Sequence, residues 1–384
     1  MKKTISVLGA TGSVGLQALD VARRHGHTVD FLCAHKNFKA TEALAREFSP
    51  RAVAMADPAA AAELSLRLRD TDVRVLSGEA GILEGIASSK SDVTVNAILG
   101  AAGLRPSLAV IETGSRLALA NKETLVIAGT TVMARARACG CEILPVDSEH
   151  CAIHQSLTRP ISEVRRLWLT ASGGPFFGYT REQLAAVSLS DTLAHPTWKM
   201  GSKITVDSAT LMNKGFEIIE ASHLFGLPED KISVVVHRES IIHSLVEYID
   251  NAYLAELSLP DMRSPVQYAI DYPARTDAVI APLDLCTLGS LTFAPPDPEA
   301  FPLLSLAREA ARLGDGMGAV LNAADEIAVE AHLRGHIPFL SITDTVVSIF
   351  DRYRTAAAVT SPDDLLSLDY EVRELTREHI YKNH

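Results

Sequence analysis

Two acidic residues separated by one position, Asp147 and Glu149, follow the apolar run 143–146. A short apolar run of this kind predicts a buried strand. On an extended backbone, residues two positions apart point to the same side, so both carboxylates would aim at one point at the end of the strand. Two hard oxygen ligands with a common aim suit Mg²⁺ or Mn²⁺. An isolated pair is more often a solvated acidic turn, but the motifs on either side favour the metal.

A second polar set lies after position 207, where Ser208 follows Asp207 in the manner of a helix cap. Helical spacing would place Asn213, Lys214 and Glu217 on one face. A surface Lys–Glu pair would have little energetic value. Here, however, apolar residues flank the polar ones, so we expect the set to be enclosed.

The turn 172–174 adds small residues to this set, because Ser172 is followed there by two glycines. Its position after an apolar run predicts a turn at the end of a strand. Together with the segment 208–217, it offers hydroxyls, an amide, an ammonium group and free backbone N–H groups. These groups predict a cradle for a phosphate.

A glycine-rich loop near the start of the chain predicts a nucleotide site. Gly9, Gly12 and Gly15 follow an apolar strand and open a helical pattern. The spacing is G-x-x-G-x-x-G, and the glycines permit a tight turn and the close approach of a pyrophosphate to a helix N-terminus. A glycine-rich loop between the first strand and the first helix is good evidence for a dinucleotide.

The end of the second predicted strand favours NADP(H) over NAD. NAD selection requires an acidic residue about 20 positions after the glycines. That position lies near His35, which Lys36 and Asn37 follow, while Asp30 comes too early in the strand. A positive and polar cluster suits a 2′-phosphate. The alternative is that these residues form only a solvated turn.

The elements that must position these groups alternate in the first part of the chain, which predicts βαβ units and a mostly parallel sheet. The strands are expected at 5–8, 29–33, 52–56, 73–76, 93–96, 117–120 and 143–146, with helices between them such as 41–48 and 122–138. The region 147–270 mixes helices with strands at 167–170, 234–236 and 254–259. A Pro- and Asp-rich stretch marks a linker, and helical patterns such as 303–313 and 318–333 follow.

The predicted fold class is therefore α/β: an N-terminal Rossmann-like NADPH-binding domain (1–146), an α+β catalytic and connecting domain (147–270), a linker (271–300) and a C-terminal helical bundle (301–384). The segment 192–202 is expected to be a mobile lid. It contains Pro196, which blocks a continuous helix, and Gly201, which supplies backbone freedom. Trp198 and Met200 on such a loop would be exposed unless they cover something.

Composition narrows the class of protein. The chain has 384 residues, a formal net charge of −11 and 47% hydrophobic residues, as expected of a globular protein of two or three domains. The negative charge disfavours nucleic-acid and membrane partners. The start resembles a signal peptide only briefly, because glycines interrupt it. Five cysteines without a framework pattern favour reduced thiols and a cytoplasmic location.

Two histidine-containing groups carry weaker hypotheses. Cysteines 139, 141 and 151 with His150 and His154 could suggest zinc, but the spacing fits no usual four-ligand pattern. We expect these thiols to pack in the core. His243 lies in an apolar run and is expected to be a satisfied core histidine.

The motifs together resemble the 1-deoxy-D-xylulose 5-phosphate reductoisomerase family almost from end to end. The matching segments are GATGSVG at 9–15, ANKETLV at 120–126, PVDSEH at 145–150, SGGPF at 172–176, HPTWKMGSKITVDSATLMNKGFE at 195–217, IHS at 242–244, PDMR at 260–263 and LNAADEIAV at 321–329. The chain departs from the family pattern at His35, where a Gly is expected, and at Asp325, where an Asn is expected. His154 is particular to this chain.

The resemblance implies a set of site residues. The metal would be held by Asp147, Glu149 and Glu217, and the substrate phosphate by Ser172, Ser208, Asn213 and Lys214. The rest of the substrate would meet Lys122, Ser148, Glu149 and His195, with Trp198 and Met200 on the lid; Lys122, Glu149 and His195 would act in catalysis. The cofactor would meet Thr11, Gly12, Ser13, Val14, Lys36, Asn37, Asn121, Glu123 and Gly201.

The implied activity is the rearrangement and reduction of 1-deoxy-D-xylulose 5-phosphate to 2-C-methyl-D-erythritol 4-phosphate by a homodimer. The implied cofactors are NADPH and Mn²⁺ or Mg²⁺, with Co²⁺ as a further candidate. The chemistry agrees, because rearranging a hydroxy-ketone needs its two oxygens polarised together, which a divalent metal does. NADPH then reduces the resulting aldehyde, and the anchored phosphate keeps the intermediate bound.

Two other hypotheses remain open from the sequence. An aspartate-semialdehyde-type NADP-dependent dehydrogenase begins with a similar glycine-rich loop, but it needs a catalytic cysteine, and the five cysteines here lie in no such setting. A non-catalytic NADPH-binding redox sensor would need no carboxylate cluster. Loss of activity to a chelator, with recovery on adding Mn²⁺, would exclude the sensor.

Overall fold

The computed structural model of the chain describes residues 2–198, 200–354, 359 and 361–383. The chain divides into two compact units. The first is formed by residues 1–124, 134–151 and 261–282, and the second by residues 125–133, 152–260 and 283–384. Each unit has its own hydrophobic core.

A seven-stranded parallel sheet forms the centre of the first unit, in the order β4-β3-β2-β1-β5-β6-β7. Its strands are β1 (Thr4–Leu8), β2 (Thr28–Ala34), β3 (Ala52–Met55), β4 (Arg74–Ser77), β5 (Val93–Asn96), β6 (Arg116–Leu119) and β7 (Ile143–Pro145). Strands β3 and β5 are buried throughout, and β1 is buried from Ile5 on, as expected when both faces of a parallel sheet are covered. The predicted α/β fold with a parallel sheet is confirmed.

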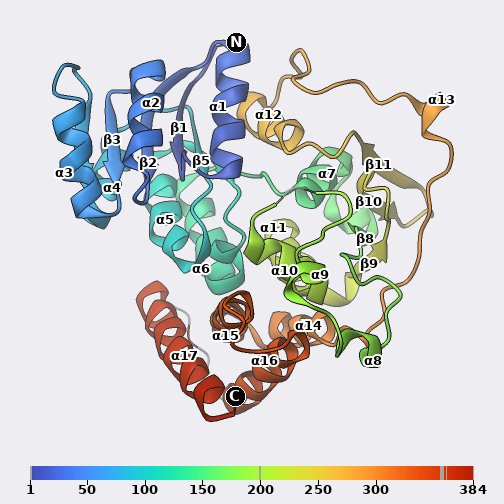
Figure 1. The fold of residues 1–384 in the computed structure, drawn as a ribbon. Coiled ribbons are helices and arrows are strands. Elements are labelled where there is room, and N and C mark those ends of the chain that lie inside the picture. The colour runs from blue at the N-terminus through green and yellow to red at the C-terminus, as the bar shows by residue number, and fades with distance from the viewer. Residues whose placement is uncertain (1, 199, 355–358, 360, 384) are drawn as a thin grey trace. The chain divides into compact units, whose positions relative to one another are not determined.

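Helices cover both faces of this sheet (Figure 1). They are α1 (Ser13–His25), α2 (Phe38–Phe48), α3 (Pro58–Arg67), α4 (Gly78–Ser88), α5 (Leu104–Thr113) and α12 (Arg263–Asp271), with a 3-10 turn at Gly100–Gly103 and parts of α6 (Glu123–Cys139) and α7 (Ser148–Ser156). Sequence signals set their ends: the side chains of Asn37 and Asp57 cap α2 and α3, and Gly26 ends α1 in the left-handed conformation.

A histidine–aspartate network attaches α12 to α1, although the two helices are far apart in the sequence. Asp271 accepts hydrogen bonds from His25 at 2.8 Å and from His27 at 2.9 Å. His27 also accepts one from the backbone N–H of Lys3 at 3.1 Å. The chain after position 260 therefore returns to the first unit before it enters the second.

The second unit contains a four-stranded sheet in the order β11-β10-β8-β9. Its strands are β8 (Val164–Ala171), β9 (Ile232–Val236), β10 (Ile242–Tyr248) and β11 (Tyr253–Leu257); β8 and β9 are parallel, and the other pairs are antiparallel. Helix α11 (Met212–Phe225) packs against β8 and β9 and follows α10 (Ser202–Thr210). The shorter elements are α8 (Arg181–Leu184), α9 (Leu189–Thr192), α13 (Leu285–Leu288) and 3-10 turns at Ile161–Glu163 and Glu229–Lys231.

The C-terminal helices share one core with this region. They are α14 (Leu303–Leu313), α15 (Asp315–Leu333), α16 (Phe339–Tyr353) and α17 (Pro362–Asn383). The contact between α11 and α14 is close, because a Cβ on Gly215 would lie 2.6 Å from the side chain of Ala307. The predicted helical C-terminal region is confirmed. None of the described helices is long and apolar enough to cross a membrane.

Two predicted segments differ in detail. Helix α6 departs from helical geometry at Ala128, and the side chain of Asp315 accepts a hydrogen bond there from the backbone N–H of Thr130 at 3.2 Å. The stretch expected to be a linker contains α13, and its Ala294 pairs with Val236 as an isolated bridge. The predicted boundaries of the functional domains, 1–146, 147–270, 271–300 and 301–384, stay a prediction.

Candidate functional site

The glycine-rich loop lies where the strand order of the parallel sheet reverses, between β1 and β5. Ligands of open α/β sheets bind at this position. Gly9 has a φ of +80°, and a Cβ there would lie 2.5 Å from the carbonyl oxygen of Ala97. A Cβ on Gly15 would lie 2.3 Å from the carbonyl oxygen of Gly9. Both positions therefore require glycine, and Gly12 and Ser13 are left exposed at the start of α1.

The end of β2 presents no acidic side chain at the predicted adenosine position. His35, Lys36 and Asn37 are exposed, and Asn37 also caps α2 by accepting a hydrogen bond from the N–H of Ala40 at 3.2 Å. The carboxylate of Asp30 instead forms an ion pair with Arg51, with their atoms 3.1 Å apart. The surface after β2 is thus positive and polar, as the sequence predicts.

Asn121 follows β6 and holds the loop that follows β5. Its amide nitrogen donates to the carbonyl oxygens of Ile98 at 2.7 Å and Gly100 at 3.0 Å, and to Glu123 at 2.8 Å. Its amide oxygen accepts from the N–H of Thr124 at 3.0 Å. The side chain is buried. Asn121 therefore shapes the edge of the sheet beside the glycine-rich loop.

The carboxylates after β7 do not lie on an extended backbone, so that part of the sequence reasoning is wrong. The strand ends at Pro145, and α7 begins at Ser148, which places Glu149 in the first turn of the helix. Asp147 precedes the helix and forms an ion pair with Lys122, with Nζ and Oδ2 2.7 Å apart. The hydroxyl of Ser148 donates to Glu149 at 2.6 Å. The helix start, rather than strand periodicity, orients the second carboxylate.

In the second unit, the predicted turn after β8 is confirmed and lies against α10. Gly173 and Gly174 have φ values of +76° and +62°. A Cβ on Gly174 would lie 2.6 Å from the carbonyl oxygen of Ser208. The hydroxyl-bearing residues Ser172 and Ser208 are therefore brought together by a close backbone approach that only glycine allows.

Ser208 is not the cap of the helix that carries Lys214, which corrects the second sequence prediction. It lies near the end of α10. Leu211, with a φ of +60°, interrupts the helical backbone before α11 begins at Met212. Asn213 and Lys214 therefore stand in the first turn of α11, where the helix dipole favours an anion.

The polar face of α11 has the predicted spacing and is enclosed. Lys214 lies 2.5 Å from Glu217 Oε2, and the amide of Asn213 donates to Glu217 Oε1 at 2.7 Å. Lys214 is 3% exposed and Glu217 is 0% exposed. Both oxygens of this buried carboxylate are oriented by neighbours on its own helix.

Arg238 is a site residue that the sequence reasoning missed. Its guanidinium donates to the carbonyl oxygens of Ser172 at 3.1 Å and Gly174 at 2.7 Å and so clamps the turn. It follows β9, which is parallel to β8, and the carboxyl ends of parallel neighbours meet at one edge. A cation directly after the β9 apolar run was the signal that could have found it.

His195 is tied to the turn and is held neutral. Its Nδ1 accepts hydrogen bonds from the N–H groups of Thr197 at 3.2 Å and Trp198 at 2.9 Å. Its Nε2 must therefore carry the proton, and it donates to the hydroxyl of Ser172 at 2.9 Å. Burial, followed by the positive charge of Arg238, lowers the pKa of His195 from 6.5 to about 4.

We expect the imidazole of His195 to titrate near pH 4 in a proton NMR titration, with the resonance identified by its absence from His195→Gln. The unfolded chain takes up this proton first as the pH falls, so the contribution of His195 to stability is present above about pH 6.5 and is lost towards pH 4. The urea-unfolded chain is the control. A midpoint above pH 6 in the folded protein would contradict the burial and hydrogen bonding described here.

The segment between α9 and α10 is a loop, as predicted, and its Lys199 lies outside the described residues. The hydroxyl of Thr197 donates to the carbonyl oxygen of Arg238 at 3.3 Å. The ring of Trp198 lies 6.1 Å from that of His243, which is buried as expected. The loop therefore rests on the same strand ends that carry the turn.

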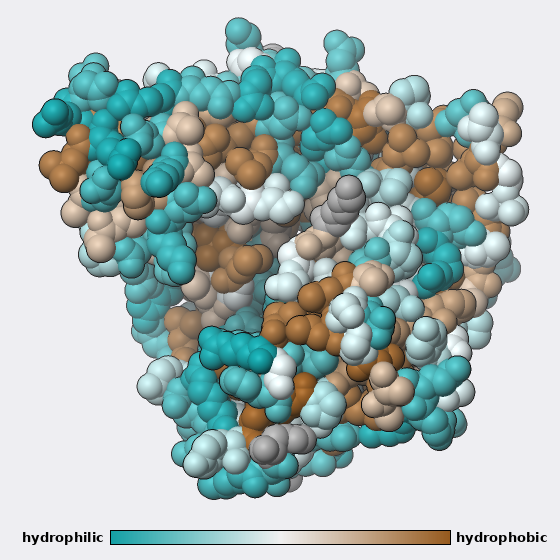
Figure 2. All heavy atoms as spheres, viewed as in Figure 1, coloured by the Kyte–Doolittle hydropathy of each residue, from teal (hydrophilic) through white to brown (hydrophobic). Residues whose placement is uncertain are grey.

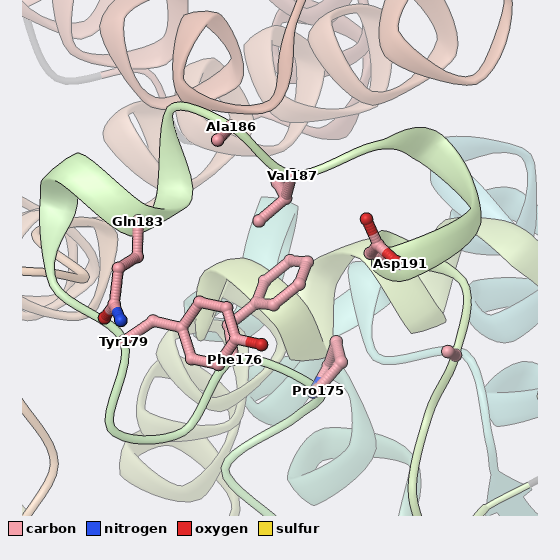
Figure 3. Close-up of a pocket in the computed structure, with 8 residues that line it drawn as sticks. Pro175, Phe176, Tyr179, Gln183, Ala186, Val187 and Asp191 are labelled. Atoms are coloured by element: carbon pink, nitrogen blue, oxygen red, sulfur yellow. The ribbon is translucent and has the colours of Figure 1, made fainter.

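A cavity of about 420 Å³ lies beside this loop (Figure 3). It is lined by Pro175, Phe176, Tyr179, Gln183, Ala186, Val187, Asp191 and Ala194. The side chains of Phe176 and Val187 point toward one another across it. Its lining includes none of the predicted phosphate residues, so the chemistry is not assigned to it.

The cysteines lie in no catalytic setting. Cys33, Cys141 and Cys151 are buried, and burial raises the pKa of the Cys33 thiol to about 12. Cys139 is exposed, so the expectation that all the central thiols pack in the core is wrong for this residue. A buried protonated thiol is a poor nucleophile.

Comparison with known proteins identifies the family. Models of 1-deoxy-D-xylulose 5-phosphate reductoisomerase match residues 5–129, and models of its C-terminal domains match residues 143–225 and 257–375. A reductoisomerase of Geobacillus kaustophilus is 48% identical, covering 98% of this chain and 99% of the relative. The chain belongs to this family.

Solved structures of the family agree with the fold. A reductoisomerase in complex with NADPH, fosmidomycin and magnesium is 40% identical, with a TM-score of 0.94 and coverage of 99% of this chain and 98% of that one. The Zymomonas mobilis reductoisomerase in complex with NADPH is 39% identical, with a TM-score of 0.92 and coverage of 99% of both chains. The family replaces the dehydrogenase alternative, which requires a cysteine nucleophile.

Proposed function

We infer that this protein rearranges and reduces 1-deoxy-D-xylulose 5-phosphate to 2-C-methyl-D-erythritol 4-phosphate, using NADPH and a divalent metal. Its membership of the family over nearly the whole chain carries this conclusion. The enclosed amide, ammonium and carboxylate groups of α11 give it a chemical basis, because they suit a phosphate and a metal.

The first unit supplies a site that fits NADPH. The pyrophosphate would lie at the exposed start of α1, where Thr11, Gly12, Ser13 and Val14 lie, because a helix N-terminus favours an anion. Lys36 and Asn37 would take the adenosine phosphate. Asn121, Glu123 and Gly201 also stay proposed cofactor residues.

Replacing Lys36 by Ala is expected to raise KM for NADPH about tenfold and to change KM for NADH little, because a charge-assisted hydrogen bond to the 2′-phosphate is lost. Steady-state kinetics with both cofactors measure this. Lys39→Ala removes an exposed lysine in the first turn of α2 and serves as the matched control. Equal use of NADPH and NADH by the wild type would refute this cofactor assignment.

The proposed metal ligands are Asp147, Glu149 and Glu217. All three offer carboxylate oxygens, the donor type that Mg²⁺ and Mn²⁺ prefer, and Glu217 is fully buried. When bound, the metal would polarise the two substrate oxygens that exchange their roles in the rearrangement. Mn²⁺, Mg²⁺ and Co²⁺ are all compatible with this donor set.

The proposed phosphate site comprises Ser172, Ser208, Asn213 and Lys214. The close approach of Gly174 to Ser208 and the position of Asn213 and Lys214 in the first turn of α11, where the helix dipole favours an anion, support it. Neutral His195, with its proton on Nε2, would donate a hydrogen bond and would not act as an acid near pH 7. Lys122 and Ser148 would complete the contacts to the substrate.

The loop 192–202 is proposed to close over the substrate, with Trp198 and Met200 as its cover. In a Trp168→Phe background, adding a phosphonate–hydroxamate substrate mimic with Mn²⁺ should change the emission of Trp198 and protect the loop from protease. Trp198→Phe is the control, because the remaining Trp168 is held by Glu247 at 2.8 Å in the sheet. Unchanged emission and cleavage with the mimic bound would refute the lid.

A homodimer is proposed to form through the edge of the four-stranded sheet. Tyr253, Leu254 and Leu257 of edge strand β11 are 50%, 41% and 39% exposed. Figure 2 shows hydrophobic atoms on the surface over this part of the chain. An open apolar edge favours pairing with another strand. Light scattering of the wild type and of Leu254→Lys tests this, and a wild-type monomer would refute it.

A cytoplasmic location of the protein also stays a proposal.

The decisive assay is NADPH oxidation with 1-deoxy-D-xylulose 5-phosphate, with and without metal. Activity should be lost to a chelator and restored by Mn²⁺. Alkylation of the exposed thiols Cys139 and Cys286 should leave the activity intact. A protein that binds NADPH but oxidises none with this substrate would instead support the redox sensor.

A further inference from the structure

A buried cluster in the second unit has no role in the site described above. Lys203 and Asp207 lie on α10, and Asp325 lies on α15. The ammonium of Lys203 is 2.6 Å from Asp207 Oδ2 and 2.7 Å from Asp325 Oδ2. Asp207 is 3% exposed and Asp325 is 0% exposed. One cation is therefore shared by two buried carboxyl groups.

The remaining oxygens of the two aspartates lack a hydrogen-bond donor among the described residues. Asp207 Oδ1 and Asp325 Oδ1 are buried and accept no hydrogen bond from any described residue. Burial, followed by the charge of Asp325, raises the pKa of Asp207 well above its usual value. Two buried carboxylates beside one ammonium would carry an uncompensated negative charge, whereas one proton between them makes the cluster neutral.

The other groups around the cluster do not remove this charge. Glu326 follows Asp325 on α15, but Arg373 of α17 holds it at 2.6 Å. On the side of α11, the ring of Phe216 lies 5.0 Å from the Lys203 ammonium. Neither group neutralises the negative charge of the second aspartate, so a proton on one of the two carboxyl groups is what would neutralise it.

The cluster joins the two functional ends of α10. Lys203 directly follows the proposed lid (192–202), and Asp207 directly precedes Ser208 of the proposed phosphate site. Lys203 ties α10 to α15 through Asp325, and Asp207 is tied to the same ammonium. A change in the cluster is expected to move the lid and the phosphate hydroxyl together.

We propose that Lys203, Asp207 and Asp325 are positioning residues that hold one proton between the two aspartates and thereby fix α10 for substrate binding. The proposal rests on the proposed function. As the pH rises, loss of the proton leaves two buried carboxylates that repel each other, and the packing of α10 on α15 weakens. Because the raised pKa belongs to the folded state, the stabilisation is present at low pH and is lost as the pH rises.

The test uses Asp325→Asn, which restores the residue expected from the family pattern. Its amide donates to Asp207 and occupies the place of the proton without titrating. In the wild type, KM for the substrate should rise several-fold with a one-proton dependence as the pH is raised from the acid to the alkaline side of neutrality, while kcat changes less. In Asp325→Asn, KM should stay flat over that range.

Two measurements without substrate accompany the kinetics. The melting temperature of the wild type should fall with rising pH more steeply than that of Asp325→Asn. Infrared spectra at the acidic end of this range should show the carbonyl band of a buried neutral carboxylic acid that Asp325→Asn lacks, and the band should disappear as the pH rises. Glu326→Gln, at the next position of α15, is the matched control and should keep the wild-type profile in all three measurements.

The outcomes separate the proposals. Identical pH profiles for the wild type and Asp325→Asn would overturn the shared proton. If Asp325→Asn lowers activity and melting temperature by the same amount at every pH, the shared proton is also overturned, because Asp325 would then contribute only to packing. If the wild type shows no activity with the substrate, the proposed function fails, while the melting and infrared data still decide whether the proton is shared.

Discussion

Glu217→Gln and Asp147→Asn should each lower kcat/KM at low Mn²⁺ by about a hundredfold or more, equivalent to about 2.7 kcal/mol of transition-state stabilisation. Each change keeps the size of the side chain and removes one charged oxygen ligand from a hard cation. Glu217 is fully buried and oriented by Asn213 and Lys214, so no solvent ligand replaces it at low cost. The measurement is kcat/KM as a function of Mn²⁺ concentration.

NADPH binding should remain near the wild-type value in both variants, because the glycine-rich loop follows β1, whereas Asp147 follows β7 and Glu217 lies on α11. A fluorescence titration with NADPH measures it. Glu239→Gln is a matched control. The carboxylate of Glu239 accepts a hydrogen bond from the hydroxyl of Thr292 at 2.7 Å and is not one of the proposed metal ligands. Wild-type turnover of either ligand variant at low Mn²⁺ would show that the ligand assignment is wrong.

Lys214→Met should raise KM for the phosphorylated substrate by about a hundredfold or more. The buried ammonium is proposed to hold the phosphate at the start of α11, and its removal also leaves the carboxylate of Glu217 without the cation 2.5 Å away. Breaking a buried ion pair in this way costs about 3–5 kcal/mol. Steady-state kinetics give the change in KM, and thermal unfolding gives the loss of stability.

A substrate without the phosphate separates these two effects of Lys214. With 1-deoxy-D-xylulose, the wild type should already lack the phosphate contact, so Lys214→Met should lose much less activity than it does with the phosphorylated substrate. Lys231→Met removes an exposed lysine from the 3-10 turn Glu229–Lys231 and serves as a control for charge alone. An equal loss on both substrates would mean that Lys214 acts through Glu217 and not on the phosphate.

The sequence alone predicted the parallel sheet, the helical C-terminal region and the nucleotide loop, because these depend on local pattern. Alternating apolar runs and helical segments determine the βαβ units. Gly9 and Gly15 are required by a tight turn and a close approach that the spacing already indicates. The spacing of Asn213, Lys214 and Glu217 likewise places them on one helical face.

Contacts between distant segments decided the rest. The period of a strand could not reveal that α7 begins directly at Ser148, and the break at Leu211 separates Ser208 from α11. Arg238 reaches the turn after β8 only because β8 and β9 are parallel neighbours. The sequence names the chemical groups, but backbone direction at the ends of elements sets where they point.

Protonation states were decided by the tertiary structure alone. His195 is neutral because its Nδ1 accepts two backbone N–H groups, and because burial and the charge of Arg238 oppose a second proton. Asp325 reads in the sequence as a small departure from the family pattern, yet packing of α15 on α10 places it beside Asp207 and one lysine. Residue type sets the ordinary pKa of a group, whereas burial and neighbouring charges, which come from distant parts of the chain, set its pKa in the folded protein.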